Sequence, residues 1–269
     1  MPARNLILSC VVCAAALCAL AVPAIADWDP GDGHKMHYPQ LPDSNGWDVN
    51  ITSDHMYDDW RCSKSGPVSG IHFWYSWLGD NPSNITWISL KIWSDMPEGD
   101  PDNVLGYSYP DAEVWNSGLL FPGQWTERHY GTGNQGWIDF QNPPPTEPGH
   151  PGYVLNDHQE YYQINIEDIA NPFPQQEGET YWLGIHVGVS DAANTVVGWK
   201  TTQDRWNDDA VYWWTFPDQQ PPEDPDWREM IDPITRESLD LAFVITPEPS
   251  TMGLLALGGL ALIRRRRSS

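Results

Sequence analysis

The chain has 269 residues, of which 37 are acidic and 14 are basic, so its formal net charge at pH 7 is −23. A surface this acidic repels phosphate groups, which excludes nucleic acids and anionic membrane surfaces as partners of the folded part. The 16 Trp and 11 Tyr residues exclude a disordered acidic chain, because so many aromatic side chains can bury a sizeable core.

The first 26 residues have the pattern of a secretory signal peptide. Arg4 gives a positive start, residues 6–22 are almost wholly apolar, and Ala24-Ile25-Ala26 is a small-x-small cleavage site. A retained membrane anchor is the alternative, but the apolar run is shorter than the roughly 20 residues that a span needs. We therefore expect cleavage after Ala26 and a mature chain that begins at Asp27.

Residues 27–246 are predicted to form a single domain, with a boundary at 143–148 as the alternative. Without the two ends, 9 basic and 36 acidic residues remain, and the net charge of this body is −27. Three of the four cysteines fall in the signal peptide, so Cys62 has no partner for an internal disulfide. We expect Cys62 to be a buried, small apolar residue, and the Pro-rich segments 141–152 and 217–227 to be exposed loops.

Alternation of apolar and polar residues predicts an all-β body. The clearest strand is Thr180–Val189, in which Tyr181, Leu183 and Ile185 share one face while Trp182 and His186 share the other. We expect an antiparallel jelly-roll-like β-sandwich. Its nine strands are predicted near residues 71–77, 85–93, 114–120, 137–140, 161–166, 180–189, 195–200, 210–216 and 239–245.

The last 23 residues, 247–269, contain three ordered parts. Pro247-Glu248-Pro249 is followed by an apolar stretch at 250–263, predicted to be a short hydrophobic helix, and by four arginines, Arg264, Arg265, Arg266 and Arg267. Fourteen helical residues cover roughly 21 Å, less than the roughly 30 Å of a hydrocarbon layer. The segment is expected to hold the chain only transiently, with the arginines on the cytoplasmic side of the inner membrane.

This tail resembles the PEP-CTERM sorting signal of exported proteins of Gram-negative bacteria. The resemblance implies that an exosortase recognises Pro247, Glu248 and Pro249 and removes the tail, leaving the body at the cell surface or in the extracellular matrix. An ordinary C-terminal anchor is the alternative. The body resembles, at "DWDPGDGHKMHYPQ" and "GWKTTQDRWNDDAVYWW", an uncharacterised domain of other PEP-CTERM proteins, many of which are associated with exopolysaccharide and biofilm matrix.

Three Asp-rich stretches could supply the oxygen ligands that calcium prefers. The first choice is Asp204, Asn207, Asp208 and Asp209, which precede a predicted strand. The other two are Asp27, Asp29 and Asp32, and Asp54, Asp58 and Asp59. The alternative is that these are turns whose side chains cap their own backbone. His34 and His37 lack the further Cys or His residues that a zinc site needs.

Carbohydrate binding is suggested by tryptophans on strand faces opposite the expected core. Sugar rings stack on indoles while polar side chains bond their hydroxyl groups. The candidate residues are Trp74, Trp87, Trp93 and Trp182. The alternative is that these rings are packed beneath loops or a second sheet.

The sequence contains no G-x-S-x-G, H-E-x-x-H, P-loop or dinucleotide motif. Glu113, Glu127 and Glu160 are the first candidates for a glycoside-hydrolysing pair, which one sequence cannot identify. We therefore expect a non-catalytic protein that binds an extracellular polysaccharide or has a structural role in the matrix. A polysaccharide-processing enzyme on the same fold is the alternative.

Overall fold

The computed structural model describes residues 27–53, 55–140, 152–213 and 227–246, and these residues form an all-β body. Within these ranges no helix has the length and apolar character needed to cross a membrane, and the one short helix is the 3-10 turn η1 (Leu78–Asp80). The strands in chain order are β1 (Trp47–Asn50), β2 (Met56–Arg61), β3 (Gly66–Val68), β4 (Gly70–Trp77), β5 (Ile85–Met96), β6 (Tyr109–Leu120), β7 (Thr126–Asp139), β8 (Gly152–Ile166), β9 (Phe173–Gln175), β10 (Thr180–Val189), β11 (Val197–Thr202), β12 (Val211–Trp213), β13 (Trp227–Glu229), β14 (Asp240–Leu241) and β15 (Phe243–Thr246).

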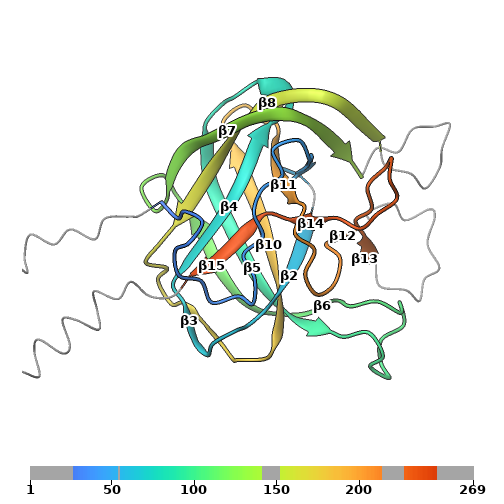
Figure 1. Ribbon diagram of the computed structural model, residues 1–269. Helices are drawn as coiled ribbons and strands as arrows, with labels where there is room; N and C mark the ends of the chain where they lie inside the picture. Colours follow the sequence, from blue (N-terminus) through green and yellow to red (C-terminus); the bar gives the residue numbers. More distant parts are fainter. Residues whose placement is uncertain (1–26, 54, 141–151, 214–226, 247–269) are drawn as a thin grey trace, which may run out of the picture.

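Five strands close into a barrel. The seven-stranded sheet has the order β14-β11-β1-β7-β8-β4-β15, and an additional pairing of β11 with β4 joins its two arms. The ring therefore runs β11-β1-β7-β8-β4, with β14 and β15 outside it. Its pairings are antiparallel except that of β1 with β7, which is parallel. Figure 1 shows the long strands β7 and β8 arching over one side of the molecule.

A six-stranded sheet, with the order β13-β12-β2-β10-β5-β6, packs against the barrel. The main hydrophobic core contains apolar side chains from both, including Phe73 and Trp199 from the barrel strands and Leu90 and Leu183 from the sheet. The alternation predicted for β10 is confirmed, because Leu183 and Ile185 lie in this core while Trp182 lies on the other face.

The outer face of the six-stranded sheet is covered by a second hydrophobic cluster. Tyr57, Tyr109, Trp182, Val211 and Trp227 are buried in it, and Trp93 packs against them. Trp227 belongs to β13, which continues the sheet beyond β12. Its indole packs against the ring of Tyr57 at a centroid distance of 5.0 Å. The sheet is thus covered on both faces, which explains why five of the six residues of β2 and seven of the ten residues of β10 are buried.

The predicted all-β class is confirmed, but the predicted jelly-roll sandwich is not. The larger sheet does not remain an open layer, because β4 pairs with both β8 and β11 and so closes the ring. Strands β1, β2, β3, β9 and β13 were not predicted, and β6, β7 and β8 begin earlier in the chain than expected. The signal peptide and the C-terminal hydrophobic helix lie outside the described residues.

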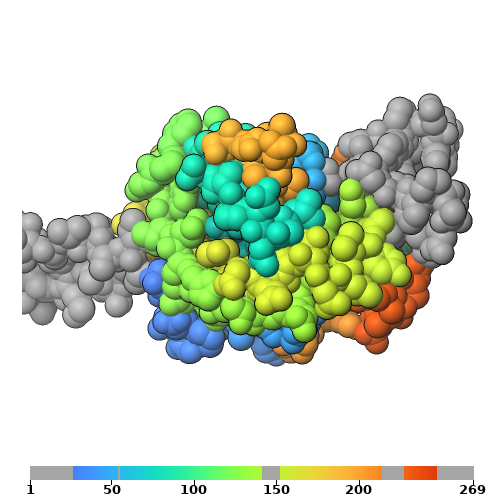
Figure 2. Space-filling view, turned by 90° about the horizontal axis from the view of Figure 1, so that it is seen from above, coloured from blue at the N-terminus to red at the C-terminus, as the bar shows by residue number. Residues whose placement is uncertain are grey.

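One end of the body is closed by two turns that lie side by side. The Asn81 amide donates to the carbonyl oxygen of Asn194 at 3.1 Å, and the hydroxyls of Ser83 and Thr195 are 2.9 Å apart. Figure 2 shows these turns together, next to residues of β7 and β8. The bonds fix the connection from β4 to β5 against the connection from β10 to β11.

The two ends of the described body meet at one pair of buried side chains. The Asn165 amide donates to the carboxylate of Asp27 at 3.0 Å, and the Asn165 Oδ1 lies 2.7 Å from the Nδ1 of His72. The other ring nitrogen of His72 lies 3.2 Å from the hydroxyl of Thr246, the last residue of β15. Residues 27 and 246 are therefore held at the same place.

Gly133 of β7 allows the loop at residues 43–46 to approach the barrel closely. A Cβ atom at this position would overlap the carbonyl oxygen of Ser44. We expect Gly133→Ala to lower the free energy of unfolding by about 1 to 3 kcal/mol, measured by urea denaturation, because the backbone must shift to relieve the overlap. The matched control is Thr132→Ala, an exposed neighbour, for which a change within about 0.5 kcal/mol is expected. Equal stability of the two variants would contradict this close approach.

Candidate functional site

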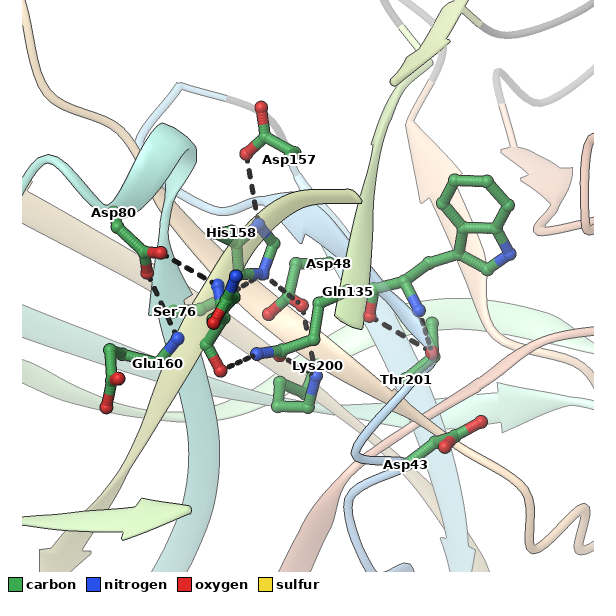
Figure 3. Close-up of polar contacts among 12 residues, drawn as sticks. Asp43, Asp48, Ser76, Asp80, Gln135, Asp157, His158, Glu160, Lys200 and Thr201 are labelled. Atoms are coloured by element: carbon green, nitrogen blue, oxygen red, sulfur yellow. Dashed lines mark hydrogen bonds and ion pairs between the residues drawn. The ribbon is translucent and has the colours of Figure 1, made fainter. Parts of the chain in front are cut away.

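The barrel is filled at one level by polar side chains, one from each of its five strands. The Ser76 hydroxyl lies 2.8 Å from the Nε2 of His158, and this nitrogen lies 3.0 Å from the carboxylate of Asp48. Lys200 donates to Asp48 at 3.1 Å and to the side-chain oxygen of Gln135. Figure 3 shows that the five residues converge from different strands. Because they reach one another across the ring, they point into the barrel.

This network is a buried ion cluster. Ser76, Asp48, Gln135 and Lys200 are fully buried, and His158 is 2% exposed. Burial opposes ionisation of Asp48, but Lys200 and His158 outweigh it and hold the pKa of Asp48 below its usual value. Burial also opposes protonation of His158, yet its contacts with Asp48 and Asp157 raise its pKa. The ammonium group of Lys200 also lies 5.0 Å from the centre of the Tyr161 ring, a cation–π contact.

Ser76 and His158 of the network, together with Asp157, have the contacts of a Ser–His–Asp triad. Ser76 lies at one ring nitrogen of His158, and the Oδ2 of Asp157 lies 3.0 Å from the other. The Ser76 hydroxyl, however, is fully buried, and Ser76 lines neither the cleft at Trp47 nor the small cavity at Trp60. A nucleophile must reach its substrate, so this geometry supports a structural role for the three residues.

An open cleft lies outside the barrel, beside strands β1 and β11. Asp48 and Lys200 point into the barrel, whereas their neighbours Trp47 and Thr201 line the cleft, as alternation along a strand requires. Two bonds join these neighbours, with the Thr201 hydroxyl accepting from the Trp47 backbone N–H at 2.9 Å and donating to its carbonyl at 3.0 Å. The cleft has a volume of about 370 Å³ and is lined by Asp43, Asn45, Gly46, Trp47, Thr201, Thr202, Gln203, Arg205, Asp232 and Leu239.

The carboxylate of Asp232 is held ionised at this cleft. The indole N–H of Trp47 donates to it at 2.7 Å, and the backbone N–H groups of Ile234 and Thr235 donate to its other oxygen. Burial opposes ionisation, but these bonds lower the pKa of Asp232. A general acid needs a raised pKa, so Asp232 is suited to accept hydrogen bonds from a ligand and not to donate a proton.

The four tryptophans predicted to bind carbohydrate do not form an exposed platform. Trp74 is fully buried inside the barrel, with its ring 5.4 Å from that of Tyr130, and Trp182 is fully buried in the second hydrophobic cluster. Trp93 packs against that cluster, and Trp87 is half-buried beside His186. Trp74, Trp182 and Trp93 are therefore packed inside the protein, which was the alternative interpretation. Alternation placed these rings on the faces opposite the core, and those faces are covered by β13 and by the barrel.

The predicted calcium ligands Asp204, Asn207, Asp208 and Asp209 do not converge on one point. In the four described ranges of the chain, no three His, Cys, Asp or Glu side chains are placed to hold a metal ion together. Asp209 is bonded to Ser238, and Asn207 lines a small cavity that also contains Asp59. Of the remaining candidates, Asp27 and Asp29 lie 3.7 and 2.6 Å from the guanidinium of Arg128, and Asp54 is outside the described residues.

The three glutamates considered for catalysis lie on three different strands and have different partners. Glu113 lies on β6 and pairs with Lys91 at 2.9 Å, and this bond lowers its pKa. Glu127 and Glu160 lie on β7 and β8, where Glu160 contacts His129 at 2.5 Å and the register places Glu127 opposite Ile164. None of the three lines the cleft. Cys62 is buried, as predicted, and its thiol donates to the carbonyl of Lys64.

The predicted processing residues fall outside the described residues. These are Ala24 and Ala26 at the signal cleavage site, Pro247, Glu248 and Pro249, and Arg264, Arg265, Arg266 and Arg267. Conversely, the residues of the cleft and of the barrel network were not predicted from the sequence. Their residues carry no shared motif, since positions 43–48, 76, 135, 157–158, 200–205 and 232 come together only through sheet pairing.

Comparison with known families gives two matches. A family model described as a domain of unknown function, DUF7901, matches residues 36–246. A second, described as the PEP-CTERM protein-sorting motif, matches residues 246–267 and confirms the resemblance of the tail. Neither the curated proteins nor the solved structures contain a significant match.

Proposed function

From the premise that this chain belongs to the DUF7901 family and carries a PEP-CTERM sorting motif, we propose that it is a surface or matrix protein that binds extracellular polysaccharide without cleaving it. The sorting motif indicates export and processing by an exosortase. The proposal places the mature body on the surface or in the biofilm matrix of a Gram-negative bacterium, after transient contact of the tail with the inner membrane.

The observation that carries the proposal is the cleft beside Trp47. Its volume of about 370 Å³ lies in the range of small-ligand sites, and its lining is mainly polar. Asp43, Asn45 and Gln203 supply acceptors and amide donors, and Arg205, whose guanidinium pairs with Glu237 at 2.8 Å, adds a cation to the lining. Such mixed groups match the many hydroxyls of a sugar. The lowered pKa of Asp232 supports binding over acid catalysis in this cleft.

Gln203→Ala is expected to weaken binding of the polysaccharide about tenfold. Gln203 is exposed, lines the cleft and makes no hydrogen bond to another described side chain, so its amide is available to a ligand. Loss of one or two ligand bonds corresponds to roughly 1 to 2 kcal/mol. The measurement is a glycan array with the full-length chain, followed by calorimetric titration of the strongest ligand.

The matched control is Gln176→Ala, an exposed glutamine that does not line the cleft and is expected to leave the affinity unchanged. Equal weakening by both variants would remove the cleft from the proposal. The supernatant of each titration is also tested for shortened glycans. Release of shorter chains would replace the proposal by the alternative, a polysaccharide-processing enzyme.

A further inference from the structure

An exposed aromatic side chain lies next to the cleft. Tyr153, on β8, is 46% exposed, and the centre of its ring lies 5.8 Å from the centre of the Trp47 ring, with an angle of 80° between the ring planes. Trp47 itself lines the cleft. Leu155, two residues further along β8, is 55% exposed and faces the same side by alternation. The surface beside the cleft is therefore apolar and open at Tyr153 and Leu155.

The indole of Trp47 connects the cleft to Tyr153. Its N–H group donates to the carboxylate of Asp232 in the cleft at 2.7 Å. The Cε3 and Cζ3 atoms, on the opposite edge of the indole, lie over Gly136 of β7, where a Cβ atom would overlap them. The indole thus extends from the cleft toward β7 and β8, and the missing side chain of Gly136 makes room for it. Because Trp47 is only 7% exposed, it positions Asp232 and Tyr153 and leaves stacking on a ligand to Tyr153.

We propose that Tyr153 is the stacking residue of a second sugar subsite, which receives the part of a polysaccharide that continues out of the cleft. This inference rests on the function proposed above for the cleft. A volume of about 370 Å³ holds only a short fragment of a polymer, so a bound polysaccharide continues over the adjoining surface. The 5.8 Å between the two ring centres is similar to the length of one sugar residue.

The chemistry of Tyr153 fits this role. A tyrosine ring has an apolar face for the C–H groups of a sugar ring and a hydroxyl for its polar groups, and it is held with few rotatable bonds. The contact with Trp47 restricts the ring further. The affinity for a polysaccharide is then expected to depend on chain length, because only a fragment that extends beyond the cleft reaches Tyr153.

The test uses the full-length chain and fragments of the polysaccharide that binds best on the glycan array, prepared by partial acid hydrolysis and separated by length. The wild type is expected to bind fragments of about six sugar residues about tenfold more tightly than fragments of one or two, measured by calorimetric titration. Tyr153→Ala is expected to remove this gain and to leave the affinity for the short fragments unchanged. Tyr153→Phe keeps the ring and is expected to keep the gain.

Phe121→Ala is the matched control, since it removes a ring that is 52% exposed in the connection from β6 to β7, and it is expected to bind like the wild type. Gln203→Ala, in the cleft, is expected to weaken the binding of short and long fragments by the same factor. If Tyr153→Ala is not folded by near-ultraviolet circular dichroism, Tyr153→Gln replaces it with the same expected result.

The outcomes separate this subsite from the cleft. A gain with length that persists in Tyr153→Ala, or a wild type without such a gain, would overturn the subsite, whereas weaker binding by Gln203→Ala would still support the cleft. An array without binding, or an unchanged affinity in Gln203→Ala, would overturn the function proposed for the cleft and the subsite with it.

Discussion

Lys200→Met is expected to lower the free energy of unfolding at pH 7 by about 3 to 5 kcal/mol. Methionine fills a similar volume but removes the ammonium group that bonds Asp48 and Gln135 inside the barrel. The Asp48 carboxylate, fully buried and already with one unpartnered oxygen, would lose its main counter-charge. Urea denaturation monitored by Trp fluorescence measures the change.

The double variant Lys200→Met with Asp48→Asn is expected to recover part of this loss. Removing both charges leaves a neutral barrel, which costs less than one buried charge without a partner. Lys64→Met, at an exposed lysine, serves as the control and is expected to change stability by less than about 0.5 kcal/mol. A double variant less stable than Lys200→Met would show that the buried charges are not coupled.

Asp240→Asn is expected to remove the part of the loss of stability between pH 4 and pH 7 that comes from this carboxyl, whereas Asp95, whose pKa burial raises to about 6, keeps its own part. Burial raises the pKa of Asp240 from 3.8 to about 7, so the folded state keeps a proton that the unfolded state releases. Stability from this group is present below pH 3.8 and is lost as the pH rises through about 7. The free energy of unfolding that this one group loses over that range is about 4 kcal/mol. Asparagine keeps the neutral form at every pH and can still accept the 2.8 Å bond from the backbone N–H of Trp206.

The measurement is urea denaturation at several pH values from 4 to 8, in the presence of a chelator so that metal binding does not contribute. The variant is expected to be more stable than the wild type at pH 8 and similar at pH 4. Asp102→Asn, an exposed acid, is expected to follow the wild-type curve. A wild-type curve that rises steadily from pH 4 to pH 8 would contradict the raised pKa of Asp240.

The strands that are visible in the sequence are those with one apolar face. Thr180–Val189 was predicted with its bounds, and Leu183 and Ile185 lie in the core as its alternation predicts. Strand β2 was missed because its sequence, MYDDWR, places two acids in the middle of a buried strand. Closure of the barrel depends on pairings between residues more than a hundred positions apart, such as Val197 with Trp77, which alternation does not encode.

The metal candidates show the same limit. Asp-rich composition identified the stretch with Asp59 and the stretch with Asn207 separately, and the fold brings these two residues to one cavity. Composition can indicate a class of ligand, but it does not show which of the ten Asp and Asn residues in the three stretches come together in the fold.

The junction of Asp27, Asn165, His72 and Thr246 determines how the body can be held and released. Because residues 27 and 246 are held at the same place, a segment attached to either end of the body leaves it from the same side. Thr246 is 5% exposed, and the Pro-Glu-Pro tripeptide starts at the next residue. A protease that cuts the chain after this residue removes no strand of the body, so the body stays folded when it is released.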